Sequence, residues 1–282
     1  MTPARLFRIR FAEFDLRRWR RVELAPPILF VGFCNAAFSE VAWHVVADGF
    51  WPAISDGLAI SVIIWAGFIL GLRWTARSDP APVSTRDLVV FSAALLTFLL
   101  PFSKPSWVGL SLLSVYLVVT SEPGSSLRRG AATLAGVTVP MFWSKQVFWL
   151  LSDKLLPIDA AIVAAVTGLK HVDNAIELQG QVGRMFVAPG CSSVANLSMS
   201  LFCWFLFSQA RRRSPSRNDI FWCVGMCLCV VAVNIGRMSL MALYPQYYAL
   251  IHGPIGATTA STLSMGVTLV LCHYGTRDEA HP

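Results

Sequence analysis

Long apolar stretches separated by short polar connections run along most of the chain. A helix needs about 20 predominantly apolar residues to cross a bilayer. Eight stretches reach or approach that length, the third and fourth being the shortest: residues 26–47, 54–73, 87–102, 106–120, 130–151, 191–209, 220–243 and 253–274. The pattern therefore predicts an all-α polytopic membrane protein with about eight transmembrane helices.

The longest connection, residues 152–190, comes just before the sixth predicted span. It contains one more apolar run, residues 157–169, which is too short to span comfortably. We predict that this run lies at the membrane interface or re-enters the bilayer. Residues 176–187, further along the connection, are predicted to form β or loop structure. The connection is thus the sizeable element expected outside the membrane.

Composition agrees with this class. Hydrophobic residues make up 55% of the 282 residues, charged residues only 14%, and the mean hydropathy is +0.58. Soluble domains carry roughly 25% charged residues. The sequence matches neither a phosphate-binding loop nor a dinucleotide fingerprint. We therefore expect no cofactor.

The basic residues predict the orientation, because Lys and Arg near span ends are retained on the cytoplasmic side. Most of the 23 basic residues fall in every second connection, starting with the amino-terminal segment. We predict a basic cytoplasmic segment (residues 1–25), a single transmembrane domain (26–274) and a cytoplasmic tail (275–282). The expected location is the cytoplasmic, or inner, membrane. This topology and attraction to anionic membrane lipid explain the net charge of +7 better than nucleic-acid binding does.

Three residues with reactive or charged side chains fall at the outer face in this topology. Cys191 follows Pro189 and Gly190 at the start of the sixth span. Arg237 lies two turns from the outward end of the seventh span, and His252 precedes the eighth. Ionisable groups in a membrane are costly, so each is a functional candidate. Their shared depth predicts that they meet.

These residue types suit cysteine-based acyl chemistry. A helix amino terminus favours the thiolate, which is the attacking form of Cys191. Arg237 keeps its charge and is suited to stabilise a thiolate or an oxyanion. His252 is suited to exchange protons near neutrality. Asn234 lies one helical turn before Arg237, where it is placed to orient the guanidinium or to donate to the oxyanion.

The order and spacing of three motifs resemble the exosortase and archaeosortase family of membrane transpeptidases. The resemblance covers residues 172–275, whereas the first half of the chain matches only as a hydrophobic multispan region. Ser193 stands where family members commonly have glycine. The motifs are Cys191-Ser192 at the head of one span, Asn234-x-x-Arg237 near the outer end of the next, and His252 with Gly256 before the last.

This resemblance implies a protein-sorting cysteine transpeptidase or endopeptidase with Cys191, Arg237 and His252 as catalytic residues. Its partners are exported proteins whose carboxyl terminus carries a short motif, a transmembrane helix and a basic tail, as in PEP-CTERM-like signals. Cleavage leaves an acyl-enzyme thioester on Cys191. Transfer to an amine or hydroxyl acceptor in the cell envelope then releases the product.

Other interpretations remain open. A cysteine in a span is usually a small apolar side chain, arginines near span ends often snorkel to the interface, and a histidine at a span boundary is often a helix-end residue. A transporter, or an acyl or glycosyl transferase acting on a lipid-linked substrate, would also have many spans. Six cysteines are interpreted as packing residues: Cys34, Cys203, Cys223, Cys227, Cys229 and Cys272.

Several further polar residues are secondary candidates. Glu40 and His44 are four residues apart in the first span and are candidates for a proton relay or half of a metal site; a mutual hydrogen bond is equally compatible. Arg184, before Cys191, is a candidate substrate contact. The spacing Cys223-x3-Cys227-x-Cys229 lacks the paired pattern of a zinc site, so no metal is assigned. The sequence does not indicate an oligomeric state.

Overall fold

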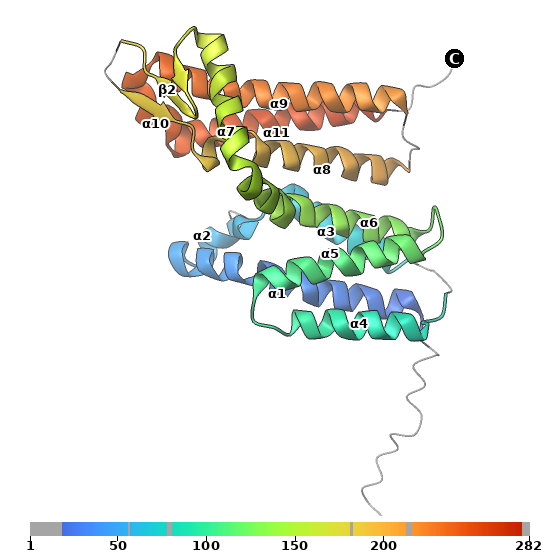
Figure 1. Ribbon diagram of the computed structural model, residues 1–282. Coiled ribbons are helices and arrows are strands. Elements are labelled where there is room, and N and C mark those ends of the chain that lie inside the picture. The colour runs from blue at the N-terminus through green and yellow to red at the C-terminus, as the bar shows by residue number, and fades with distance from the viewer. Residues whose placement is uncertain (1–18, 56, 78–80, 181–182, 213–215, 278–282) are drawn as a thin grey trace, which may run out of the picture. The chain divides into compact units, whose positions relative to one another are not determined.

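The computed structural model describes residues 19–55, 57–77, 81–180, 183–212 and 216–277. Most of the predicted basic segment (1–25) and of the predicted tail (275–282) lies outside these residues. The chain forms two compact units, Met1–Ala135 and Gly136–Pro282. Figure 1 traces both units in chain order, from blue at the amino terminus to red at the carboxyl terminus.

The first unit is helical throughout its described part. Helix α1 packs against α4 and α5, and Phe33 of α1 stacks on Phe68 of α3 with ring centroids 3.8 Å apart. Phe33 and Leu110 are almost fully buried, so aromatic and aliphatic side chains form this core. The elements are α1 (Arg21–Asp48), α2 (Phe50–Ser55), η3 (Gly57–Ala59), α3 (Val62–Thr75), α4 (Thr85–Phe98), α5 (Ser103–Thr120) and most of α6 (Ser126–Thr138).

A buried carboxylate joins three helices of this unit. Asp87 forms a capping box with Ser84 at the start of α4. It also pairs with Arg21 of α1 at 2.7 Å and accepts a hydrogen bond of 2.8 Å from the hydroxyl of Tyr116 of α5. Asp87 therefore has a structural explanation, because a buried charge needs a partner and hydrogen bonds.

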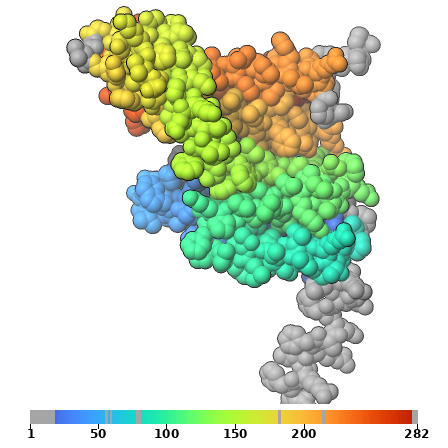
Figure 2. All heavy atoms as spheres, viewed as in Figure 1, coloured from blue at the N-terminus to red at the C-terminus, as the bar shows by residue number. Residues whose placement is uncertain are grey.

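The second unit combines long helices with a small sheet. Helices α8, α9 and α11 pack side by side. Figure 2 shows the sheet residues, in yellow, lying against α7 in yellow-green. The elements are η4 (Val139–Trp143), α7 (Ser144–Thr167), β1 (His171–Val172), β2 (Ala175–Glu177), β3 (Arg184–Phe186), η5 (Pro189–Cys191), α8 (Val194–Arg211), α9 (Arg217–Leu243), η6 (Pro245–Tyr247), α10 (Tyr248–His252) and α11 (Pro254–Gly275).

The sheet has the order β1-β2-β3, and both strand pairs are antiparallel. Ala175 pairs with Phe186 and Glu177 with Arg184. Ile176 is fully buried. The backbone N–H of Gln179, just after β2, donates to the backbone carbonyl of Ala242 at 3.0 Å, which joins the sheet to α9. The β structure predicted over residues 176–187 is therefore present in part, and it adds a small sheet to an otherwise helical fold.

Each stretch predicted to span a membrane overlaps a described helix. Within the described residues, three helices are long and apolar enough to cross a bilayer: α1, α9 and α11. Helix α3 is apolar but shorter. A predominantly helical chain with helices able to span a membrane is thus confirmed at this level, whereas eight spans and their orientation stay predictions.

The apolar run 157–169 is not a separate element, and its predicted location at the membrane interface stays a prediction. Helix α7 continues through Pro157 to Thr167 and ends at Gly168, whose left-handed φ of 74° suits a helix end. The predicted span 130–151 is instead divided, because α6 is followed by the π-helical segment η4. Pro140 in η4 lacks the backbone N–H that a continuous α-helix requires.

Candidate functional site

Cys191 ends the single turn η5, just before α8. Its backbone N–H donates to the carbonyl of Ala188 at 2.8 Å, and the N–H of Ser192 donates to Pro189 at 3.3 Å. Helix α8 begins only at Val194. Cys191 therefore lies in a hydrogen-bonded turn before α8 and does not itself open that helix, contrary to the prediction that it starts the sixth span.

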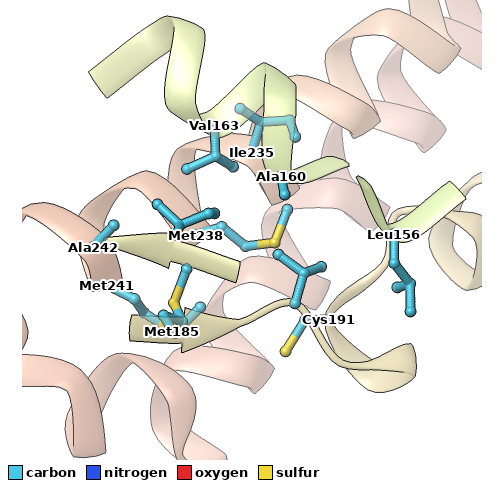
Figure 3. Packing of buried hydrophobic residues seen from close by; sticks show 11 residues of the cluster. Leu156, Ala160, Val163, Met185, Cys191, Ile235, Met238, Met241 and Ala242 are labelled. Carbon is cyan, nitrogen blue, oxygen red and sulfur yellow. The ribbon is translucent and has the colours of Figure 1, made fainter. Parts of the chain in front are cut away.

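The thiol sits in an apolar environment. Cys191 is only 7% exposed, and Figure 3 shows it in a cluster with its sulfur directed away from Val163 and Ile235. The partners come from α7, from the sheet and its flanking residue, and from α9: Leu156, Ala160, Val163, Ile176, Met185, Val187, Ile235, Met238, Met241 and Ala242. Three separate parts of the chain thus pack around the cysteine turn.

Asn234 of α9 fixes this turn from one side. Its side-chain Nδ2 donates to the carbonyl oxygen of Cys191 at 2.7 Å and to Oγ of Ser193 at 3.1 Å. Asn234 is 4% exposed and Ser193 is 5% exposed. A glycine in place of Ser193 would lack this acceptor. The sequence predicted that Asn234 would orient Arg237 or donate to an oxyanion, but its amide holds the cysteine turn.

Asp159 of α7 fixes the turn from the other side. The hydroxyl of Ser192 donates to Oδ2 of Asp159 at 2.9 Å. Burial raises the pKa of Asp159, while hydrogen bonds from Ser192 and from the hydroxyl and backbone of Ser193 act in the opposite direction. Sequence reasoning missed Asp159; the available signal was a carboxylate inside the apolar run 157–169.

Arg237 contacts the segment that carries His252. Its Nε donates to the carbonyl of Ile251 and its Nη2 to the carbonyl of His252, both at 3.1 Å. The exposed imidazole of His252 stacks on Tyr248, with ring centroids 5.2 Å apart. The guanidinium therefore holds the backbone at the carboxyl-terminal end of α10.

One helix consequently joins both parts of the predicted site. Asn234 and Arg237 are one turn apart on α9, a rise of about 4.5 Å. The first contacts the Cys191 turn, and the second contacts the His252 segment. Ile251 also packs against the apolar cluster that includes Cys191. The predicted thiol, cation and imidazole thus belong to adjoining segments of one unit.

A cavity of about 350 Å³ lies beside the cysteine turn. Its walls are mostly apolar and aromatic, and Lys145 contributes a cation. Because Pro189 and Val194 bracket Cys191 in sequence, the cavity borders the thiol-bearing segment. Its lining residues are Ser144, Lys145, Phe148, Trp149, Ser152, Pro189, Val194 and Ala195.

The secondary candidates lie elsewhere. Arg184 is exposed at the edge of the sheet, paired in register with Glu177. Glu40 and His44 belong to α1 in the other unit, where Nδ1 of His44 lies 3.0 Å from Oδ2 of Asp48. All seven cysteines are free thiols. In the described part of the chain, no group of three or more His, Cys, Asp or Glu side chains is arranged to hold a metal ion.

No protein-family model, no curated protein and no solved structure matches this chain. The functional assignment therefore depends on the residues themselves and on their contacts.

Proposed function

We propose that the chain is a membrane-embedded, exosortase-like cysteine transpeptidase or endopeptidase that sorts exported proteins. The observation that carries this proposal is the pair of contacts made by α9: Asn234 holds the Cys191 turn, and Arg237 holds the His252 segment. These contacts tie the Cys191 turn and the His252 segment to neighbouring positions of one helix, which supports a site to which a thiol, a cation and an imidazole contribute.

In the proposed reaction, the thiolate of Cys191 attacks the scissile peptide carbonyl. The negative charge of the tetrahedral intermediate falls on the carbonyl oxygen, where Arg237 stabilises it. Collapse breaks the C–N bond, and the departing amine takes a proton from His252. The products of this step are a thioester on Cys191 and a released carboxyl-terminal segment.

The second step resolves the thioester. An acceptor amine or hydroxyl, or water, loses its proton to His252 and attacks the thioester carbonyl. The C–S bond breaks and Cys191 is left as the thiolate. The exported protein leaves with its carbonyl carbon bonded to the nitrogen or oxygen of the acceptor. The mostly apolar cavity next to the turn suits side chains that flank the scissile bond.

The proposed substrates are exported proteins that end in a recognition motif, a transmembrane helix and a basic tail. The proposed site lies at the outer face of the cytoplasmic membrane, with both termini of the enzyme inside. The long apolar helices α9 and α11, which flank the His252 segment, support a site close to the membrane.

The test compares carboxyl-terminal peptides of exported proteins from cells carrying wild type, Cys191→Ala or Cys203→Ala. Cys203 is a matched control because it is a buried thiol on α8, away from the turn. We expect Cys191→Ala cells alone to accumulate precursors that retain the helix and the basic tail. Identical carboxyl termini in all three strains, with every protein expressed, would refute the proposal and favour a transporter.

The intermediate provides a second test. Trapping should yield a hydroxylamine-sensitive acyl group on Cys191 of wild type and none on Cys191→Ala. A lipid-linked acyl or glycosyl transferase using His252 as base would process its substrate without this thioester.

A further inference from the structure

The carboxyl of Asp159 has an unusual setting within the second unit. It is 8% exposed and lies on α7 beyond the predicted fifth span. A buried carboxyl is costly unless hydrogen bonds compensate for lost water. Its hydrogen-bond partners are Ser192 and Ser193, the two residues that follow Cys191.

The contrast with Asp87 is informative. Asp87 is also buried, but it caps α4 and forms an ion pair with Arg21, which accounts for it as a structural residue. Asp159 lies inside α7, far from either end of that helix. Its hydrogen bonds with Ser192 and Ser193 join α7 to the cysteine turn.

The contacts form a continuous polar chain around the nucleophile. Asp159 accepts from Ser192 and Ser193, Ser193 accepts from Asn234, and Asn234 donates to the Cys191 carbonyl. Helices α7 and α9 thus hold the turn from opposite ends of the chain of hydrogen bonds. Networks of this kind fix geometry when every member is satisfied.

We propose that Asp159 is a positioning residue that, through Ser192 and Ser193, holds the Cys191 turn in the geometry required for attack. This inference rests on the proposed function, because it assigns Asp159 a part in the reaction of Cys191. Asp159 does not exchange a proton with the substrate in this scheme. Its effect is on the placement of the sulfur, and small misplacements of a reacting atom are costly in rate.

The experiment uses the full-length protein in detergent or lipid vesicles, with a precursor that accumulates in Cys191→Ala cells as the substrate. The variants are Asp159→Ala, Asp159→Asn and Ser192→Ala. Asp153→Asn is the control, because Asp153 is an exposed carboxylate on the same helix. The kinetic constants kcat and KM are measured for each protein.

A second measurement needs no substrate. The rate of N-ethylmaleimide modification is followed by mass spectrometry at Cys191 and at Cys203. Cys203 is 1% exposed and serves as an internal control, since it reacts only if the helices separate. A turn that is loosened locally exposes Cys191 and leaves Cys203 protected.

For Asp159→Ala and Ser192→Ala we expect a fall in kcat of about 10-fold or more with KM unchanged, and faster modification of Cys191 alone. Asp159→Asn should retain more activity than Asp159→Ala, because its side-chain oxygen still accepts from Ser192. If Asp159→Ala fails to fold, Ser192→Ala and Asp159→Asn decide the question.

Wild-type kcat and wild-type Cys191 modification in Asp159→Ala or in Ser192→Ala would overturn the inference while leaving the proposed function in place. Equal modification of Cys191 and Cys203 would also overturn it, because Asp159 would then support the whole helix packing. If Cys191→Ala cells accumulate no precursor, the proposed function fails, and the positioning role fails with it.

Discussion

Asn234 donates a hydrogen bond of 2.7 Å to the carbonyl oxygen of Cys191, 43 residues earlier in the chain. Both residues are buried, so water does not compete for the bond. The placement of the candidate nucleophile therefore depends on α9 as much as on the turn that contains it. The predictions below test this arrangement and the packing around it.

Replacing Asn234 by alanine should lower the free energy of unfolding by about 1 to 3 kcal/mol, because the buried Cys191 carbonyl loses its donor. Asn234→Asp should be worse, since a carboxylate oxygen would face the carbonyl oxygen. Thermal unfolding and turnover measure both effects. Asn218→Ala, at an exposed position of the same helix, is the control; an equal loss there would contradict the assignment.

Arg237→Lys should reduce turnover by about 10-fold or more while the protein stays folded, because lysine keeps the charge but loses the planar fork of donors. A single ammonium does not reproduce the geometry in which Nε and Nη2 reach the carbonyls of Ile251 and His252. The measurement is kcat/KM with thermal unfolding as a check. Arg217→Lys, exposed at the start of α9, is the matched control; near-normal activity of Arg237→Lys would remove Arg237 from the site.

Burial raises the pKa of Asp159 above its ordinary value of 3.8. The folded chain then keeps this proton to a higher pH than the unfolded chain, so the contribution of Asp159 to stability falls as pH rises from 3.8 through the raised pKa. Asp159→Asn has no such titration. Its unfolding temperature relative to wild type should therefore be higher at about pH 7 than at about pH 4. A pH-independent difference would contradict this prediction, and Asp153→Asn is the control.

Gly130→Ala should destabilise the first unit. A Cβ there would lie 2.5 Å from the backbone nitrogen of Thr75 and 2.6 Å from the carbonyl oxygen of Gly71, so backbone atoms of α3 and α6 would have to separate. Such overpacking costs about 1 to 3 kcal/mol. Gly266→Ala in α11 is the control, because its added Cβ meets nothing within 4 Å. Thermal unfolding distinguishes the two, and equal behaviour would show that the helices approach less closely.

The positions of the helices were predictable because the lengths of the apolar stretches indicate them. Each predicted span overlaps a helix. Hydrogen bonds from α9 reach the backbone of Cys191 and of His252, but a meeting of their side chains stays a prediction. The i, i+3 spacing of Asn234 and Arg237 correctly indicated a shared helix face. The partners of these side chains were not predictable, because hydrophobicity does not show which distant carbonyl a donor reaches.

Asp159 shows the same limit more clearly. Its carboxylate lies in the run 157–169, for which the apolar character alone was used in the prediction. Its hydrogen-bond partner Ser192 comes 33 residues later in the chain. The two prolines also behave differently: α7 continues through Pro157, whereas the helix becomes π-helical around Pro140. Local sequence does not settle such cases, since neighbouring side chains decide whether a missing N–H is tolerated.

The hydrogen bonds around Cys191 also bear on biosynthesis. The turn emerges from the ribosome after α7 but before α9, so its donor Asn234 is made 43 residues later. Arg237 and the His252 carbonyl that it binds follow in turn. Until α9 is made, the Cys191 turn lacks its donor. The hydrogen bonds that hold this turn are therefore completed only late in synthesis.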